Sequence, residues 1–134
     1  MTEPALLGIN QFKFIQETNT IAKTLYRGDE STGYFVMEHE GSSYQVPAAK
    51  KFIILHVTTV MGHTNAVFKS TQYYKHTSPS VAGGTELMNY NTPLDDMPVW
   101  DFDTYIVIDA GDYINTNHGS AYYREIMLGI ECDA

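Results

Sequence analysis

Four aspartates lie close together in one stretch of the chain, and carboxylates at this density are suited to binding a cation. Within nine residues the chain carries Asp95, Asp96, Asp101 and Asp103. Ca²⁺ takes about six to eight oxygen ligands, many of them carboxylates. We predict an acidic loop without a cofactor, in which water relieves the repulsion between the carboxylates. The alternative is a Ca²⁺ site with Asp95 and Asp96 as metal ligands.

An aromatic side chain lies beside two of these carboxylates. Trp100, the only tryptophan, directly precedes Asp101, and Tyr90 lies earlier in the same region. A flat ring flanked by carboxylates can bind the face and hydroxyl groups of a sugar, or hold a cation over its π surface. The sequence thus predicts a site for a carbohydrate or small cationic ligand, formed by Tyr90, Trp100, Asp101 and Asp103. The alternative is that Trp100 fills the core where a strand begins.

Catalysis would need a histidine near these acids. The chain has five histidines, but no two of them have the H-x-H spacing of cupin metal sites. Motifs such as G-x-S-x-G, a P-loop or C-x-x-C are also missing from the sequence. The second hypothesis is a small enzyme or metalloprotein, in which folding brings His63 or His118 to the acidic Asp95–Asp103 loop. Such a site would have to split the pKa values of paired carboxylates by burial.

The overall charge excludes two classes of partner. Sixteen acidic residues against eight basic ones give a net charge of −8, and Lys and Arg form no cluster. Nucleic acids and anionic membranes both need several positive contacts, so neither is expected as a partner. No apolar run is long enough for a transmembrane helix. The first ten residues lack the pattern of a secretory signal, so we expect a cytoplasmic protein or a part of a virion or surface assembly.

The elements that must position these residues are strands. Lys51–Met61 is dense in β-branched and aromatic residues, which favour a pleated strand, and it reads as a central one. Further strands are predicted at Ile9–Ile15, Thr20–Arg27, Tyr34–His39, Ala66–Lys75, Val99–Ile108, Asp112–Ile114 and Tyr122–Glu131. Residues 77–98 contain three prolines and a Gly-Gly pair and predict a long irregular connection. The pattern predicts one domain over residues 1–134, an all-β antiparallel sandwich of jelly-roll character, with a barrel as the alternative.

Alternation along the strands predicts which side chains form the core. Within Lys51–Met61 it groups Ile53 and Leu55 with Val57, opposite His56. In the last strand it turns the aliphatic residues inward and the acidic residues outward. The complete predicted core consists of Phe12, Phe14, Ile21, Leu25, Phe35, Ile53, Leu55, Val57, Ile106, Ile108, Ile126, Leu128 and Ile130.

Two short segments resemble a known class of protein module. Tyr44–Ile54, with the sequence Y-Q-V-P-A-A-K-K-F-I-I, resembles the V-P-A-G-K-x-F-x-I opening of jelly-roll-like β-sandwich modules in phage, viral and surface proteins. Ala49 stands in place of the usual glycine. Ala110–Ile114, A-G-D-Y-I, resembles the A-G-D turn in later strands of such modules. The resemblance implies a trimeric or similarly oligomeric structural or binding module, and it carries over no catalytic residues.

The composition agrees with a surface that another subunit partly covers. Charged residues make up 18% of the chain, below the roughly 25% of typical soluble domains. Ten of the seventeen aromatic residues are Tyr, a residue enriched at interfaces. The alternative is that tyrosines occupy half-exposed strands. From the sequence we predict a non-enzymatic homo-oligomeric module whose partner is another copy, with a carbohydrate or small ligand as a further partner.

Overall fold

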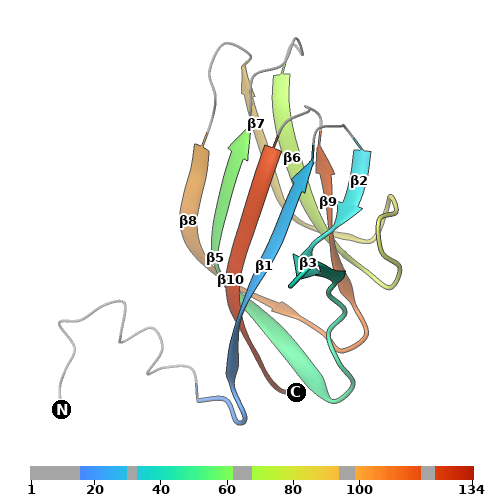
Figure 1. Ribbon diagram of the computed structural model, residues 1–134, viewed down its shortest axis with the longest axis vertical. Helices are drawn as coiled ribbons and strands as arrows, with labels where there is room; N and C mark the ends of the chain where they lie inside the picture. Colours follow the sequence, from blue (N-terminus) through green and yellow to red (C-terminus); the bar gives the residue numbers. More distant parts are fainter. Residues whose placement is uncertain (1–15, 30–32, 62–67, 94–98, 119–122) are drawn as a thin grey trace, which may run out of the picture.

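The computed structural model describes residues 16–29, 33–61, 68–93, 99–118 and 123–134. Within these ranges the chain forms ten β-strands and no helix. The strands make two antiparallel sheets that pack face to face as the two layers of Figure 1, and the sheets do not close into a barrel. The predicted antiparallel sandwich is confirmed, and the barrel alternative is wrong.

The order of the strands is that of a jelly roll. The six-stranded sheet, sheet A, has the order β4 (Ser42–Ser43), β3 (Glu38–His39), β1 (Ile21–Asp29), β10 (Tyr123–Asp133), β5 (Lys50–Met61) and β8 (Val99–Ile108). The four-stranded sheet, sheet B, has the order β2 (Gly33–Val36), β9 (Tyr113–His118), β6 (Phe68–His76) and β7 (Thr85–Pro93). The chain passes from one sheet to the other at β1–β2, β2–β3, β5–β6, β7–β8, β8–β9 and β9–β10. Two four-stranded sheets linked in this way, with β3 and β4 added beside β1, form a jelly roll.

One large apolar cluster fills the space between the sheets. Leu25, Phe52 and Met127 from sheet A pack with Tyr73 and Ile114 from sheet B, and all five side chains are fully buried. β5 lies between β10 and β8, as its run of β-branched residues predicts for a central strand. The core therefore depends on which face of β5 and β10 points toward sheet B.

An extra residue in β5 changes which of its side chains point inward. Leu128 of β10 pairs with His56, but the next residue of β10 pairs with Ile54, so Leu55 has no partner on that strand. Such a bulge turns two successive side chains to the same side. Leu55 and His56 therefore both face away from sheet B, and Val57 joins Ile54 in the core between the sheets. The predicted grouping of Leu55 with Val57 is wrong for this reason.

The two faces of β10 are inverted relative to the prediction. Its inner face carries Glu125 and Met127, which are fully buried, together with Tyr123. Its outer face carries Ile126, which is 37% exposed, and Leu128, which is 43% exposed. The prediction that these two residues form the core is wrong. Alternation gave the correct period but could not tell which face meets the other sheet.

A second, smaller cluster lies on the outer face of sheet A. Ile53, Leu55 and Ile130 are buried there together with Cys132, a free cysteine. These three aliphatic residues are buried as predicted, but not between the sheets. Burial raises the pKa of the Cys132 thiol, which therefore stays protonated and unreactive at neutral pH.

Of the remaining residues predicted for the core, some are buried, some are partly or largely exposed, and two lie outside the described residues. Leu25 and Ile108 are fully buried as predicted, whereas Phe35 and Ile106 are half-buried. Ile21 is 55% exposed at the start of β1, so its assignment to the core is wrong. The predicted core residues Phe12 and Phe14, and the predicted strand Ile9–Ile15, lie outside the described residues.

The irregular connection predicted for residues 77–98 is wrong in part. Thr85–Pro93 forms β7, which pairs with β6 along its length at the edge of sheet B. Its asparagines and single Glu gave no strand signal, because β-propensity is low for these residues. Pairing with β6 and the packing of Leu87 and Met88 against the core stabilise the strand instead.

The two segments that resemble known modules lie side by side in the structure. The Val46 N–H donates to the Asp112 carbonyl at 3.0 Å, and the Gly111 N–H donates to the Val46 carbonyl at 2.8 Å. Ala49 has a φ of 63°, a left-handed conformation that costs an L-residue roughly 1–2 kcal/mol. This conformation explains why glycine suits the position, and why the motif describes a turn rather than a binding site.

A substitution at Gly129 tests the close packing of β10 against β5. A Cβ at Gly129 would collide with the backbone carbonyl of Ile53 and lie 2.5 Å from Cζ of Phe52, both at the bulge. Because a backbone atom cannot move aside, Gly129→Ala is expected to destabilise the fold by about 2–3 kcal/mol in chemical denaturation. The control Gly28→Ala meets only the end of the Tyr26 side chain and should change stability by less than about 0.5 kcal/mol. Equal effects of the two substitutions would contradict the packing.

The acid stability of the fold should depend on Asp133, near the end of β10. Its carboxylate accepts hydrogen bonds from Lys50 Nζ at 2.7 Å, from Asn19 Nδ2 at 2.7 Å and from Thr18 Oγ1 at 2.9 Å. These bonds lower the pKa of Asp133 from 3.8 to about 2. A lowered pKa stabilises the fold above the ordinary value, and this contribution disappears as the pH falls toward about 2.

The melting temperature of Asp133→Asn should therefore fall less than that of the wild type between neutral and acidic pH. The control is Asp109→Asn, at an exposed residue whose carboxylate lies 3.5 Å from Lys75 Nζ. If both variants follow the wild-type decline, Asp133 does not contribute to it.

Candidate functional site

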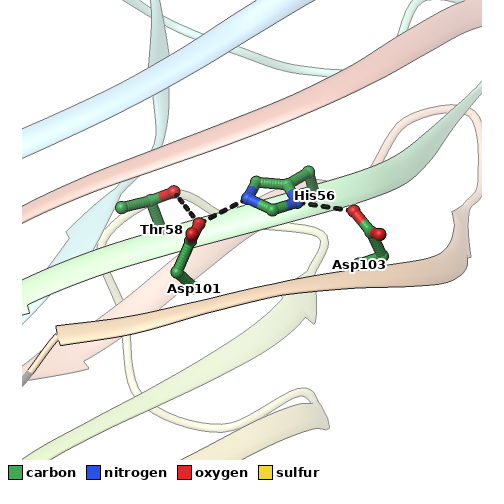
Figure 2. A network of polar contacts seen from close by, with 4 residues as sticks. All are labelled: His56, Thr58, Asp101 and Asp103. Atoms are coloured by element: carbon green, nitrogen blue, oxygen red, sulfur yellow. Dashed lines mark hydrogen bonds and ion pairs between the residues drawn. The ribbon is translucent and has the colours of Figure 1, made fainter. Parts of the chain in front are cut away.

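The outer face of sheet A carries a compact group of polar side chains on two neighbouring strands. We call His56, Thr58, Asp101 and Asp103 the His56 cluster. The pairing of β5 with β8 sets His56 opposite Asp103 and Thr58 opposite Asp101. Figure 2 shows the imidazole lying between the two carboxylates. The bulge at Leu55 is what places His56 on this face.

The imidazole contacts both carboxylates at once. His56 Nδ1 lies 2.7 Å from Asp103 Oδ1, and Nε2 lies 2.5 Å from Asp101 Oδ1. Thr58 Oγ1 donates a hydrogen bond to the same Asp101 oxygen at 2.8 Å (Figure 2). The His56 side chain is 29% exposed, and those of Asp101 and Asp103 are 59% and 75% exposed, so protons exchange freely between the cluster and water.

This geometry requires the protonated form of His56. A carboxylate only accepts hydrogen bonds, and a neutral imidazole has a single N–H to donate. Two carboxylate contacts therefore need both ring nitrogens to carry protons. In agreement, the hydrogen bonds to Asp103 and then Asp101 raise the pKa of His56. The Thr58 hydroxyl and then His56 lower the pKa of Asp101.

The chemistry of the cluster is proton binding rather than nucleophilic attack. Thr58 carries its only hydroxyl, and this donates to Asp101 instead of facing the imidazole, so no base activates it. The protonated imidazole has no lone pair to offer a metal. In the described ranges, no group of three or more His, Cys, Asp or Glu residues is placed to hold a metal ion. A histidine of this kind changes charge close to neutral pH.

The four residues predicted to bind a ligand come from β7 and β8, and they divide between the inner and the outer side of sheet A. Tyr90 stacks on Trp100 with ring centroids 5.3 Å apart, and Phe102 meets Tyr90 edge-on at 5.4 Å. Partial burial raises the pKa of Tyr90 to about 12. The three rings lie between sheets A and B, whereas Asp101 and Asp103 lie on the outer face of sheet A. The structure thus brings the predicted residues together as two separate pairs, and ligand binding by either pair stays a prediction.

Three other predicted residues lie outside the described residues. These are Asp95 and Asp96, the predicted Ca²⁺ ligands, and His63 of the enzyme hypothesis. His118 ends β9, where its backbone is in register with Gly33 of β2 and Thr71 of β6. Sheet B therefore holds His118, while Asp101 and Asp103 belong to sheet A.

Apolar side chains surround the His56 cluster. Of the nine large apolar residues that are exposed in the described part of the chain, six lie on the outer face of sheet A. We call these six the apolar face: Tyr26 of β1, Ile126 and Leu128 of β10, and Val99, Tyr105 and Val107 of β8. Their exposures range from 37% to 59%. A concentration of this kind marks an interaction surface more often than single exposed apolar residues do.

Sequence patterns could not have found His56 and Thr58. The two residues precede Asp101 by more than forty positions, and only the register of β5 against β8 brings them together. Alternation alone assigned His56 and Thr58 to one face but did not say which face or which partner strand.

Comparisons with known proteins do not assign the chain to a family. No model of a protein family matches the chain, and no curated protein matches it as a relative. In the part of the chain that the structure describes, no helix is long and apolar enough to cross a membrane.

The protonation of His56 can be tested by NMR titration of its imidazole. Asp103→Asn and Asp101→Asn should each lower the pKa of His56 toward its ordinary value of 6.5, because each removes a carboxylate that stabilises the imidazolium. Asp109→Asn is the control, because Asp109 pairs with Lys75 and not with His56. An unchanged His56 titration in both cluster variants would show that the observed contacts do not hold the proton.

Proposed function

We propose that the protein is a non-enzymatic, homo-oligomeric structural module whose copies associate through the outer face of sheet A. The observation that carries this proposal is the orientation of β10. This strand buries an acidic residue, Glu125, between the sheets and turns Ile126 and Leu128 toward solvent. A strand that is apolar on the face away from the core is typical of a sheet covered on both faces.

The size of the apolar face supports association of moderate strength. Burying an exposed aliphatic or aromatic side chain contributes about 1.5–3 kcal/mol, so a side chain that is already half-buried contributes about 1 kcal/mol. Six such residues on each of two copies give about 10 kcal/mol. Loss of rotational and translational freedom costs about 4–15 kcal/mol. The attraction and the cost are similar, so single charges at this face should decide whether copies associate.

The distribution of charge favours a second copy as the partner. The acids of the His56 cluster lie on β8, at one edge of sheet A, whereas the outward residues of β1 on the other side of β10 include Thr24 and Tyr26 and no acid. A two-fold axis parallel to β10 would set β8 of one copy over the β1 side of the other. The two acidic edges would then lie apart, and the apolar residues of β10 would meet.

The jelly-roll fold and the resemblance of Tyr44–Ile54 and Ala110–Ile114 to phage, viral and surface modules support the same proposal. The resemblance implies a trimeric or similarly oligomeric structural or binding module. On this basis we propose that the protein is made in the cytoplasm and belongs to a virion or surface assembly. Two independent features, an uncovered apolar sheet face and a fold used in assemblies, thus favour a structural role.

Measurement of the molar mass in solution by light scattering tests this proposal. The wild type should form an oligomer, and Leu128→Lys should remain folded but weaken association at least about tenfold, since a Lys ammonium cannot be buried without a partner. Val107→Lys should act in the same direction.

Val81→Lys is the matched control. Val81 is 38% exposed and Val107 is 37% exposed, but Val81 lies in the loop between β6 and β7, away from the apolar face. A wild type that stays monomeric at high concentration would reject the proposal. If Val81→Lys and Val107→Lys weaken association equally, the interface does not lie on the apolar face.

A further inference from the structure

We propose that the His56 cluster controls association through the apolar face by binding a proton. Copies associate while a protonated His56 bridges Asp101 and Asp103, and association weakens when that proton leaves. This inference rests on the proposed function and adds its regulation.

The position of the cluster connects it to the interface. On β10, the register partner of His56 is Leu128, and that of Thr58 is Ile126. His56 therefore has an aliphatic residue of the apolar face on one side and Asp103 on the other. A partner that covers Leu128 must also approach the imidazole. The charge state of the cluster thus lies inside the surface that would be buried, not on its distant rim.

Loss of one proton changes both the charge and the geometry of the cluster. With His56 protonated, one cation offsets one of the two carboxylate charges and the cluster has a net charge of −1. With His56 neutral, the net charge is −2, and one ring nitrogen presents a lone pair to a carboxylate oxygen. That carboxylate loses the hydrogen bond from the imidazole and needs water in its place. Covering the face would then bury a carboxylate without its cationic partner on each of the two copies, which opposes association.

Neighbouring groups do not replace the missing charge. From β8 the imidazole is faced by Asp101, Asp103 and Tyr105, and from β1 the outward residues near it are Thr24 and Tyr26. None of these is a cation.

The two cations on the described outer face of sheet A are placed elsewhere. On β5, Lys51 is paired with Glu17 at 3.0 Å. On β10, Arg124 is in register with Val60, beyond the Thr58 row. Among the described residues, the proton on His56 is therefore the positive charge that offsets the two aspartates in part at this position.

The direction of the pH dependence follows from the contacts. Hydrogen bonds to Asp103 and Asp101 raise the pKa of His56 above its ordinary value of 6.5. The bridged form is therefore complete below that value and disappears as the pH rises through the raised pKa. Association should be strongest in mildly acidic solution and weaken on the alkaline side of neutrality. The net charge of −8 acts in the same direction, because each lost proton adds repulsion between copies.

Sedimentation equilibrium of the full chain between about pH 6 and about pH 9 tests the inference, because this range spans the titration of a histidine with a raised pKa. The wild-type dissociation constant should rise by roughly tenfold or more across the range. His56→Gln keeps a polar side chain of similar size but cannot titrate, so its dissociation constant should change by less than about twofold. Asp103→Asn should move the midpoint of the wild-type change to lower pH.

The control is His76→Gln, at a histidine of β6 in sheet B. Circular dichroism confirms that each variant is folded, and His76→Gln should keep the full wild-type pH dependence. An oligomer whose dissociation constant does not change with pH, or a pH dependence retained by His56→Gln, overturns this inference and leaves the proposed function standing. A wild type that is monomeric at every pH overturns both.

Discussion

The extra residue at Leu55 is the constraint on which the proposed association surface depends. Side chains of a regular strand alternate between faces, so one unpaired residue reverses every assignment beyond it. Before the bulge Ile54 points into the core, and after it Val57 does. The same shift turns His56 to the outer face and sets it opposite Asp103. Without the bulge, the imidazole would point between the sheets, where an ionised side chain is costly to bury.

A polar layer inside the sandwich complements this outer surface. Glu125 is fully buried and accepts a hydrogen bond from Thr116 Oγ1 at 2.9 Å. Nearby, the Tyr73 hydroxyl and Thr59 Oγ1 share a hydrogen bond of 2.6 Å. Burial, and then the charge of Glu125, raises the pKa of Tyr73, so the phenol stays protonated and able to donate. Because buried polar groups with partners cost little, β10 can hold its acid inside and leave its aliphatic residues outside.

The sequence was informative about elements and less so about faces. The β-branched run of β5 predicted a central strand, and turn residues divided the chain well enough to predict a sandwich. β7 was missed because its asparagines and Glu carry no strand signal. The prediction of which β5 side chains face the core was wrong at the bulge, because Ile53, Ile54 and Leu55 are all apolar and do not show where the alternation breaks. The prediction for the faces of β10 was wrong for another reason. A buried Glu125 is stable only through partners on other strands, which the sequence of β10 does not reveal.

The candidate site shows the same division. Asp101 and Asp103 were singled out because carboxylates are dense in this stretch and lie beside Trp100. Their partner His56 comes from a strand distant in sequence, so it could be identified only from the register. Trp100 was grouped with the acids because it is adjacent to Asp101, but adjacent residues of a strand point to opposite faces. The contacts between strands therefore could be identified only from the fold.

One comparison of two neighbouring substitutions tests the orientation of β10 most directly. Met127→Lys and Leu128→Lys place the same charge on successive residues of the strand, and chemical denaturation of dilute protein reports the stability of each. The structure predicts that Met127→Lys abolishes or severely destabilises folding, because Met127 is fully buried between the sheets, while Leu128→Lys folds with nearly wild-type stability. The reverse order would show that the aliphatic face of β10 points inward, and the proposed surface would not exist.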